Sequence, residues 1–198
     1  MGLDEEWFRA INTGWANPAL DPFMVALSVL GSSIVILYVL PIWFSGRKNR
    51  SFDYLVALAL VLTLTAVIKF AVDRPRPDEV MSGVRIVPVP SLFPDLEPAF
   101  PSGHVARIAV LAAILVLVLP DWRFAFPLAV FVLLETLSRI YVGAHWPTDT
   151  IGGAALGITV GILVWRLDRV GAYTRTRAAI LRALGVRETR AERSEHPR

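Results

Sequence analysis

Three short polar segments of this chain hold the residue types that a phosphoryl-transfer site requires. Such a site needs cationic donors around the phosphoryl oxygens, a nucleophile in line with phosphorus and an acid near the leaving oxygen. In chain order, the segments are Lys69 to Arg76-Pro77, Pro101-Ser102-Gly103-His104, and Ser138-Arg139 to His145 and Asp149. Each segment alone is a weak signal, but the three together predict a site that binds and transfers a phosphoryl group.

The positive charges of these segments come from Lys69, Arg76 and Arg139. An Arg side chain can bind phosphate through two parallel N–H donors, whereas a Lys side chain binds it as a compact charge. A single Lys at the end of an apolar helix is more often a residue that reaches toward the membrane surface. The two arginines and two histidines expected at the same depth favour phosphate binding for Lys69.

Ser102 and Gly103 stand where a helix is predicted to begin. Pro101 interrupts the preceding structure, and Ser102 is a favourable N-cap residue. The backbone N–H groups and the dipole at such a helix start attract an anion, and Gly103 allows its oxygens to approach closely. An ordinary helix cap is the simpler interpretation. The two are compatible, because the cap geometry itself presents the donors.

Asp149 follows His145 by four residues, about one helical turn, and Pro147 between them suits the first turn of a helix. A carboxylate at that distance can accept the Nδ1 proton of His145 and leave Nε2 available to attack phosphorus. A lone histidine at a membrane interface is more often a satisfied polar residue. A second histidine, His104, expected at the same depth, makes catalysis the better interpretation.

Two more charged residues are predicted to support the site. Glu135 precedes Arg139 by four residues, the favourable order for a helical ion pair. A carboxylate within a membrane span needs a partner, and either Arg139 or Arg107 can serve. Arg107 follows His104 by three residues, so the two share one face of a helix. An equal alternative for Arg107 is that its side chain extends to the outer surface.

The elements that position these residues are long apolar runs. The chain has 198 residues, of which 55% are hydrophobic, and its mean hydropathy of +0.54 is too high for an ordinary soluble domain. We predict an all-α integral membrane bundle with about five transmembrane helices and an N-terminal interfacial helix. The expected spans are residues 22–44, 54–68, 108–120, 124–134 and 151–165. One domain is expected over residues 1–198.

If these spans cross the membrane alternately, the charged residues at their ends fall in the same leaflet: Lys69, Arg107, Glu135, Arg139 and Asp149. The loop at residues 45–51, the loop at Arg123 and the Arg-rich tail at 168–198 then lie on the other side. Because basic loops stay in the cytoplasm, we predict a multi-pass protein of the plasma membrane with a cytoplasmic C-terminus and an extracytoplasmic site. The tail is either solvated or in contact with anionic lipids.

Two patterns lie outside the polar segments. Trp7, Phe8, Ile11 and Trp15 recur at helical spacing, which predicts an interfacial amphipathic helix within residues 1–20, with a frayed terminus as the alternative. Gly153, Gly157 and Gly161 form a stripe that lets helices pack closely. We expect this stripe to pack within the chain, and a homodimer through the same face is the alternative.

The prolines, the N-terminal residues, the net charge and the lack of cysteine exclude several kinds of structure and function. Residues 71–100 contain several prolines, which argue against a long helix there. The N-terminus opens with acidic residues, so no cleavable signal peptide is expected. The net charge of +3 does not indicate nucleic-acid binding, because the basic residues lie where membrane topology places them. The chain has no cysteine, which excludes disulfides.

The three segments, in this order and with these spacings, resemble the motifs of the type 2 phosphatidic acid phosphatase (PAP2) superfamily, which also contains the vanadium haloperoxidases. The resemblance implies that His145 is the nucleophile and forms a phosphohistidine, that Asp149 orients it, and that His104 protonates the leaving oxygen. It also implies that no metal or other cofactor takes part. By the same resemblance, the phosphoryl oxygens are held by Lys69, Arg76, Ser102, Gly103 and Arg139.

The position of the site, at the depth of lipid headgroups, favours a lipid substrate over a bulky soluble one. The resemblance points to polyprenyl diphosphate, phosphatidylglycerophosphate or phosphatidic acid. Polyprenyl diphosphate is favoured because the chain has no added headgroup-selective domain. Three alternatives remain: a lipid-to-lipid phosphotransferase, a vanadate-dependent peroxidase, and a non-catalytic membrane protein with the same helices.

Overall fold

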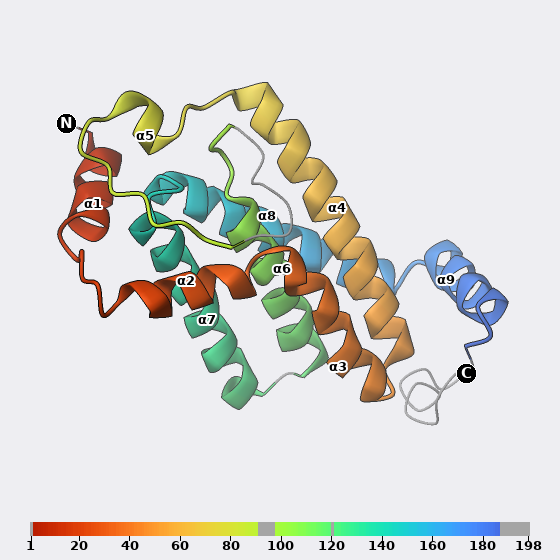
Figure 1. The fold of residues 1–198 in the computed structure, drawn as a ribbon. Helices are drawn as coiled ribbons and strands as arrows, with labels where there is room; N and C mark the ends of the chain where they lie inside the picture. The colour runs from red at the N-terminus through yellow and green to blue at the C-terminus, as the bar shows by residue number, and fades with distance from the viewer. Residues whose placement is uncertain (1, 91–97, 120, 187–198) are drawn as a thin grey trace.

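The computed structural model describes residues 2–90, 98–119 and 121–186, and within these ranges every regular element is a helix (Figure 1). The all-α prediction is therefore confirmed for the described residues. The helices are α1 (Leu3–Asn12), α2 (Asp21–Leu30), the 3-10 helix η1 (Ser33–Tyr38), α3 (Val39–Phe44), α4 (Lys48–Val72), α5 (Pro77–Val80), α6 (Gly103–Val118), α7 (Trp122–Tyr141), α8 (Pro147–Leu167) and α9 (Gly171–Ala183).

Helix α6 is the centre of the bundle and packs against α4, α7 and α8 (Figure 1). After His104 and Arg107, its residues are small or aliphatic on all sides, as expected for a helix that other helices surround. Its packing with α8 is close because the glycine stripe faces it. An added Cβ at Gly157 would lie 2.2 Å from the carbonyl oxygen of Ala106. The stripe thus packs within the chain, as predicted, and this face is covered rather than open to a second copy.

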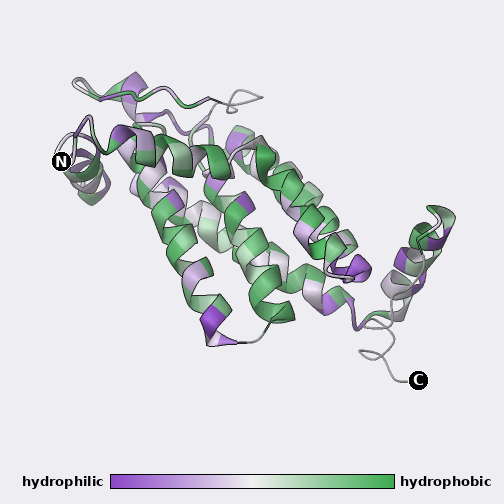
Figure 2. Ribbon diagram, turned by 60° about the horizontal axis from the view of Figure 1, so that its bottom comes forward, coloured by the Kyte–Doolittle hydropathy of each residue, from purple (hydrophilic) through white to green (hydrophobic). Residues whose placement is uncertain are grey.

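The outer surface of the bundle suits a membrane. Figure 2 shows hydrophobic residues along most of the bundle helices, with hydrophilic residues more frequent toward helix ends and in connecting segments. Large apolar side chains on this surface include Phe70 on α4, Phe126 on α7 and Ile151 on α8, each at least 64% exposed. The protein is therefore a multi-pass membrane protein.

The number of membrane crossings differs from the simple count of apolar runs. By length and composition, three helical stretches of the described chain can cross a membrane, those of α4, α7 and α8. The pair α2 and η1–α3 adds a fourth if it counts as one bent span, and α6, with 16 residues, is a shorter apolar helix. The prediction of about five transmembrane helices stays a prediction.

The predicted span over residues 22–44 is not one straight helix, and its membrane crossing stays a prediction. The chain bends by 64° between α2 and the helical stretch that begins at Ile34. At the bend, the guanidinium of Arg107 donates hydrogen bonds of 3.0 and 3.2 Å to the carbonyl oxygen of Gly31. The carboxyl group of Glu135 lies against the same glycine, where an added Cβ would be 2.3 Å from Oε1. Polar groups of other helices therefore occupy the break, which the uncharged run itself does not reveal.

The predicted N-terminal helix exists as α1, but its apolar residues are divided. Phe8 and Ile11 are buried against the bundle, and the ring of Phe8 lies 5.4 Å from that of Trp146. Trp7 remains exposed, and Trp15 lies beyond the end of the helix. The helix thus packs on α7 and α8. Its position at the membrane interface stays a prediction.

The Arg-rich tail begins with a docked helix rather than a fully solvated segment. Arg177 on α9 is buried and pairs with Asp53 on α4 at 2.8 Å and with Asp168 after α8 at 2.6 Å. Burial opposes ionisation of Asp168, but the charges of Arg50 and Arg177 outweigh it and hold the pKa of this carboxyl below its usual range. Residues 187–198 of the predicted tail lie outside the described residues.

The proline-rich connection between α4 and α6 contains only the four-residue helix α5 in its described part, residues 73–90 and 98–102, as the prolines predict. It returns across the bundle end and donates from the amide of Val87 to the carbonyl of Val142 at 3.0 Å. The amide of Arg85 likewise bonds to the Asn12 side chain of α1 at 2.9 Å. The connection therefore ties α1 to the turn that follows α7.

Candidate active site

The first polar segment is held against the second. Lys69 lies in the last turns of α4 and is only 3% exposed. Its Nζ donates to the carbonyl oxygen of Pro98 and, at 3.3 Å, to that of Ala99. These two residues lead directly into Pro101 and Ser102, so the ammonium group fixes the end of the long connection beside the start of α6.

The second segment is held against the third. The amide of Ser102 donates to the carbonyl oxygen of Asp149 at 2.9 Å. Gly153 makes this approach possible, because an added Cβ there would lie 2.4 Å from the carbonyl oxygen of Ser102. The starts of α6 and α8 therefore meet backbone to backbone.

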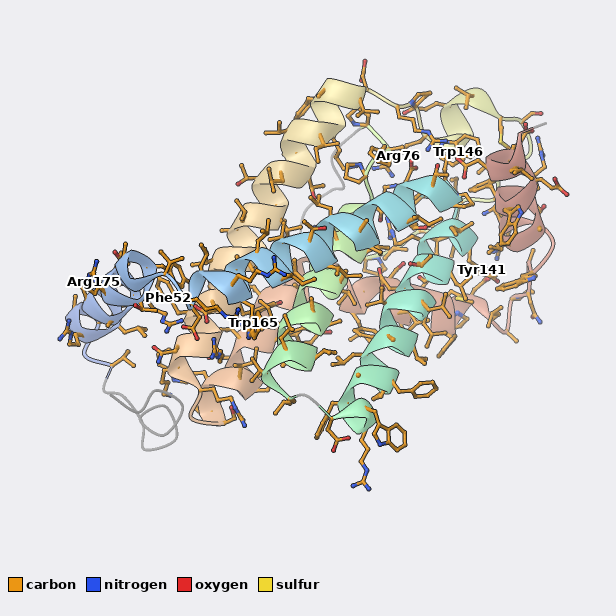
Figure 3. The ribbon with its side chains drawn as sticks, turned by 180° about the vertical axis from the view of Figure 1, so that it is seen from behind. Phe52, Arg76, Tyr141, Trp146, Trp165 and Arg175 are labelled. Carbon is orange, nitrogen blue, oxygen red and sulfur yellow. The ribbon has the colours of Figure 1, made fainter. Side chains whose placement is uncertain are left out.

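The first and third segments also meet. The indole Nε1 of Trp146 donates to the carbonyl oxygen of Pro75 at 3.0 Å, and Arg76 Nη1 lies 3.5 Å from the carbonyl oxygen of Ala144. Figure 3 shows Arg76 and Trp146 close together at the end of the bundle where α4 ends and α8 begins. The three segments are thus gathered at one end of the helices.

Most of the predicted site residues are buried there. Their exposed fractions do not exceed 3% for Lys69, Ser102, His104, Arg139, His145 and Asp149. Glu135 is fully buried as well, whereas Arg76, Gly103 and Arg107 are partly exposed. Burying so many polar and charged side chains costs free energy, so a cluster of this kind indicates a functional site rather than an ordinary core.

The start of α6 has the properties of an anion site. The helix begins at Gly103 with Ser102 at the N-cap position, as predicted, but the serine side chain makes no capping bond. Its buried Oγ has no hydrogen-bond partner among the described residues. The first amide bonded to the Ser102 carbonyl is that of Ala106, so the preceding amides have no acceptor within the helix. An added Cβ at Gly103 would meet only ordinary contacts, the nearest at 3.5 Å, so packing alone does not require this glycine.

The turn between α7 and α8 sets the position of His145. Gly143 has a φ of +88°, a backbone conformation that residues other than glycine rarely adopt. An added Cβ there would lie 2.5 Å from the carbonyl oxygen of Arg85. Helix α8 then begins at Pro147. His145 Nδ1 faces Asp149 Oδ2 at 3.7 Å, longer than a hydrogen bond but within the range that a small movement closes.

Asp149 is held firmly from its other sides. Its Oδ2 accepts from the amide of Trp146 at 2.9 Å, and its Oδ1 accepts from Arg74 Nη1 at 2.7 Å. Two such donors fix the position and the plane of the carboxylate. The arrangement can therefore orient an imidazole and stabilise the positive charge that develops on it.

Arg139 is anchored by residues that sequence reasoning missed. Its Nη1 donates to the hydroxyl of Ser28 on α2 at 3.2 Å. That hydroxyl lies 2.7 Å from the hydroxyl of Ser138, which in turn donates to the carbonyl oxygen of Met24. Ser138 adjoins Arg139 in the motif, but nothing in the local sequence around Ser28 indicates this contact.

Arg107 bonds to Gly31 across the bundle, so the alternative in which it only extends to the surface is wrong.

Arg74 is the second residue missed. Its position next to the motif residue Arg76 does not indicate a role, but its Nη1 bonds to Asp149 at 2.7 Å and to Thr148 Oγ1 at 2.6 Å. The repeated Arg-Pro in Arg74-Pro75-Arg76-Pro77 is the one signal that could have drawn attention to it.

A metal centre was not expected from the sequence. Within the described ranges, no group of three or more His, Asp or Glu side chains is arranged to hold a metal ion. Metal independence itself stays a prediction, which activity measurements test.

Comparison with known proteins agrees with the motifs. Residues 50–170 match the model of the PAP2 superfamily. The chain is 27% identical to an undecaprenyl-diphosphatase of Sulfolobus acidocaldarius, covering 86% of this chain and 81% of that protein. It is 28% identical to the undecaprenyl-diphosphatase BcrC of Bacillus subtilis, covering 84% of each. Among solved structures, LpxE of Aquifex aeolicus is similar, with a TM-score of 0.73, 31% identity, and coverage of 84% of this chain and 96% of that one.

Proposed function

This chain belongs to the PAP2 superfamily, and we propose that it is the member that removes a phosphate from a polyprenyl diphosphate. It is a membrane lipid phosphatase. The observation that carries the proposal is the start of α6. There the buried Ser102 hydroxyl has no partner among the described residues, and the Ser102 amide bonds to Asp149 of the His145–Asp149 pair. The two relatives named undecaprenyl-diphosphatases, each matching more than four-fifths of this chain, support the choice of lipid.

In the proposed reaction, Nε2 of His145 attacks phosphorus. An N–P bond forms, the bond from phosphorus to the leaving oxygen breaks, and His104 gives that oxygen a proton. Asp149 stabilises the positive imidazole from the Nδ1 side. Water, activated by His104, then cleaves the N–P bond, which releases phosphate and restores His145.

The residues proposed to donate hydrogen bonds to the phosphoryl oxygens come from three elements. Lys69 and Arg76 lie at and after the end of α4, Ser102 and the following amides lie at the start of α6, and Arg139 lies on α7. Gly103 leaves room for the phosphoryl oxygens, as its uncrowded Cβ position allows. Glu135 and Arg107 are proposed to support this set from the break after α2. Residues 1–198 form one domain in this proposal.

The experiment that tests the substrate measures phosphate release by the purified protein. Polyprenyl diphosphate, phosphatidylglycerophosphate and phosphatidic acid are supplied separately in mixed micelles. We expect kcat/KM to be highest for the polyprenyl diphosphate. A higher value for either other lipid would overturn the choice of substrate, and release from none of them would overturn the phosphatase proposal.

Two further measurements separate the alternative activities. A phosphotransferase would move the phosphate to a second lipid added to the micelles, which product analysis detects. A vanadate-dependent peroxidase would oxidise bromide in the presence of peroxide.

Activity is expected to survive EDTA and to be inhibited by vanadate. Vanadate adopts a five-coordinate form that resembles the transition state of phosphoryl transfer, and transition-state analogues bind about 10²–10⁸-fold more tightly than substrates. Phosphate release is measured with each reagent and with both. Loss of activity in EDTA that Mg²⁺ restores would contradict the metal-free mechanism.

The site is proposed to face the extracytoplasmic side, with α9 in the cytoplasm. Because the chain has no cysteine, single cysteines report topology directly. Ser82→Cys, exposed after α5, is expected to react with an impermeant thiol reagent in intact cells, and Ala179→Cys, exposed on α9, is not. Labelling of Ala179→Cys but not Ser82→Cys would place the site in the inner leaflet.

Glu135→Gln is expected to preserve the fold but weaken phosphate binding. The neutral amide of Gln is easier to bury than the charged carboxylate of Glu135. Arg139, one turn further along α7, then loses the electrostatic attraction of a nearby carboxylate. A double-mutant cycle with Arg139→Ala on kcat/KM should show a coupling of about 0.5–3 kcal/mol. Glu6→Gln, an exposed change on α1, is the control. Strictly additive losses would mean that Glu135 acts separately, and Arg107 would become its partner.

A further inference from the structure

The guanidinium of Arg74 joins the N-terminal helix to the carboxylate behind the nucleophile. One of its nitrogens, Nη1, bonds to Asp149 Oδ1 at 2.7 Å, and the other, Nη2, bonds to Asp4 on α1. The guanidinium also lies over the ring of Trp146, 5.4 Å from its centroid. Nη1 and one face of this side chain therefore hold Asp149 and Trp146 at the start of α8, and Nη2 connects them to α1.

Asp4 caps the start of α8. Its Oδ1 accepts from the amide of Thr148 at 3.0 Å, and its Oδ2 accepts from the Thr148 hydroxyl at 2.7 Å. A carboxylate at this position satisfies an amide that the helix leaves without an acceptor and interacts well with the helix dipole. Asp4 thus serves α8 as a capping residue supplied by a distant part of the chain.

Asp4 is suited to remain charged in this role. Burial opposes its ionisation, but hydrogen bonds from Thr148 and Arg74 outweigh that effect and hold the pKa of its carboxyl below the usual range. The resulting order is a carboxylate, a guanidinium and a second carboxylate, running from α1 to Asp149 beside His145.

The far end of α1 is fastened independently. The side-chain amide of Asn12 donates to the carbonyl oxygens of Arg85 at 2.7 Å and Tyr141 at 2.9 Å. Phe8, between the two ends, packs on Trp146. The helix is therefore bound at both ends to the segments that flank His145.

We propose that Arg74 and Asp4 are positioning residues of the catalytic site and that α1 is part of its framework rather than only an interfacial anchor. Arg74 fixes the Oδ1 side of Asp149 so that Oδ2 faces His145 Nδ1. Asp4 fixes Arg74 and the first turn of α8. Neither side chain contacts the phosphoryl group in this proposal, which rests on the function proposed above.

The proposal predicts an effect on turnover rather than on substrate binding. Arg74→Gln is expected to lower kcat by about 10–100-fold, the loss typical of residues that orient a functional side chain from behind, with KM little changed. Arg74→Lys restores one charge and should recover part of the loss. Asp4→Asn should lower kcat less, and its effect should nearly vanish in the Arg74→Gln background, because the two act through one path.

Controls separate positioning from a general loss of structure. Glu6→Gln removes an exposed acid from the same helix and should leave kcat and exchange unchanged. Amide hydrogen exchange of the purified protein gives a readout that needs no substrate. Asp4→Asn should speed exchange at Thr148, whose amide bonds to Asp4, and leave the middle of α6 unchanged.

The outcomes are distinguishable from a failure of the proposed function. If the wild-type protein releases phosphate but both Arg74→Gln and Asp4→Asn keep its kcat, the positioning role is overturned. A raised KM with unchanged kcat would also overturn it, since Arg74 would then bind substrate. If the wild type hydrolyses no lipid, the proposed function fails, and unchanged exchange at Thr148 in Asp4→Asn overturns the framework role of α1 on its own.

Discussion

His145→Ala is expected to abolish phosphate release from every lipid that the wild-type protein hydrolyses. The change removes the nitrogen that forms the N–P bond, and the remaining oxyanion donors have no nucleophile to assist. Turnover is measured with the lipid that gives the wild type its highest kcat/KM. The variant should still bind vanadate weakly through the cationic side chains.

The chain offers a matched control for this change. It contains three histidines, and His196, in the segment outside the described residues, belongs to none of the motifs. His196→Ala should leave turnover unchanged. Near-normal release by His145→Ala in a folded protein would contradict the covalent mechanism, and rapid quenching of the wild type with a labelled substrate should reveal an acid-labile phosphoprotein.

His104→Ala is expected to produce the second-largest loss, about 10²–10⁴-fold in kcat, the range that general acid–base catalysis contributes. The loss should be smaller for a diphosphate than for a monophosphate, because phosphate leaves more readily than an alkoxide without a proton. Both substrates are compared in the same micelles. An equal loss for the two would contradict the role of His104 as the acid at the leaving oxygen.

The two predictions depend on different parts of the structure. His104 lies in the first turn of α6, where the helix start also presents Ser102 and the leading amides. His145 lies in the turn before α8 and depends on Asp149 for orientation. Both histidines act in both steps of the proposed reaction, so damage to either helix start is expected to slow formation and cleavage of the N–P bond.

Some of this architecture follows from the sequence by itself. The four-residue interval between His145 and Asp149 places the two side chains together because one helical turn has nearly that length. Ser102 was identified as the N-cap and the glycine stripe as a packing face for the same reason: each depends on residues that are close neighbours along one helix. The sequence can propose the site residues because the motif spacings are local patterns.

Only the tertiary structure decided what lies around those residues. The bend after α2 arises where Arg107 and Glu135 of other helices meet Gly31, although residues 22–44 carry no charge of their own. The link between Asp4, Arg74 and Asp149 joins positions at least 70 residues apart. Spacing along the chain sets which side chains share a helix face, whereas contacts between helices depend on how the whole bundle packs and where its connections return. Sequence therefore determined which groups can do the chemistry, and packing determined which groups hold them in place.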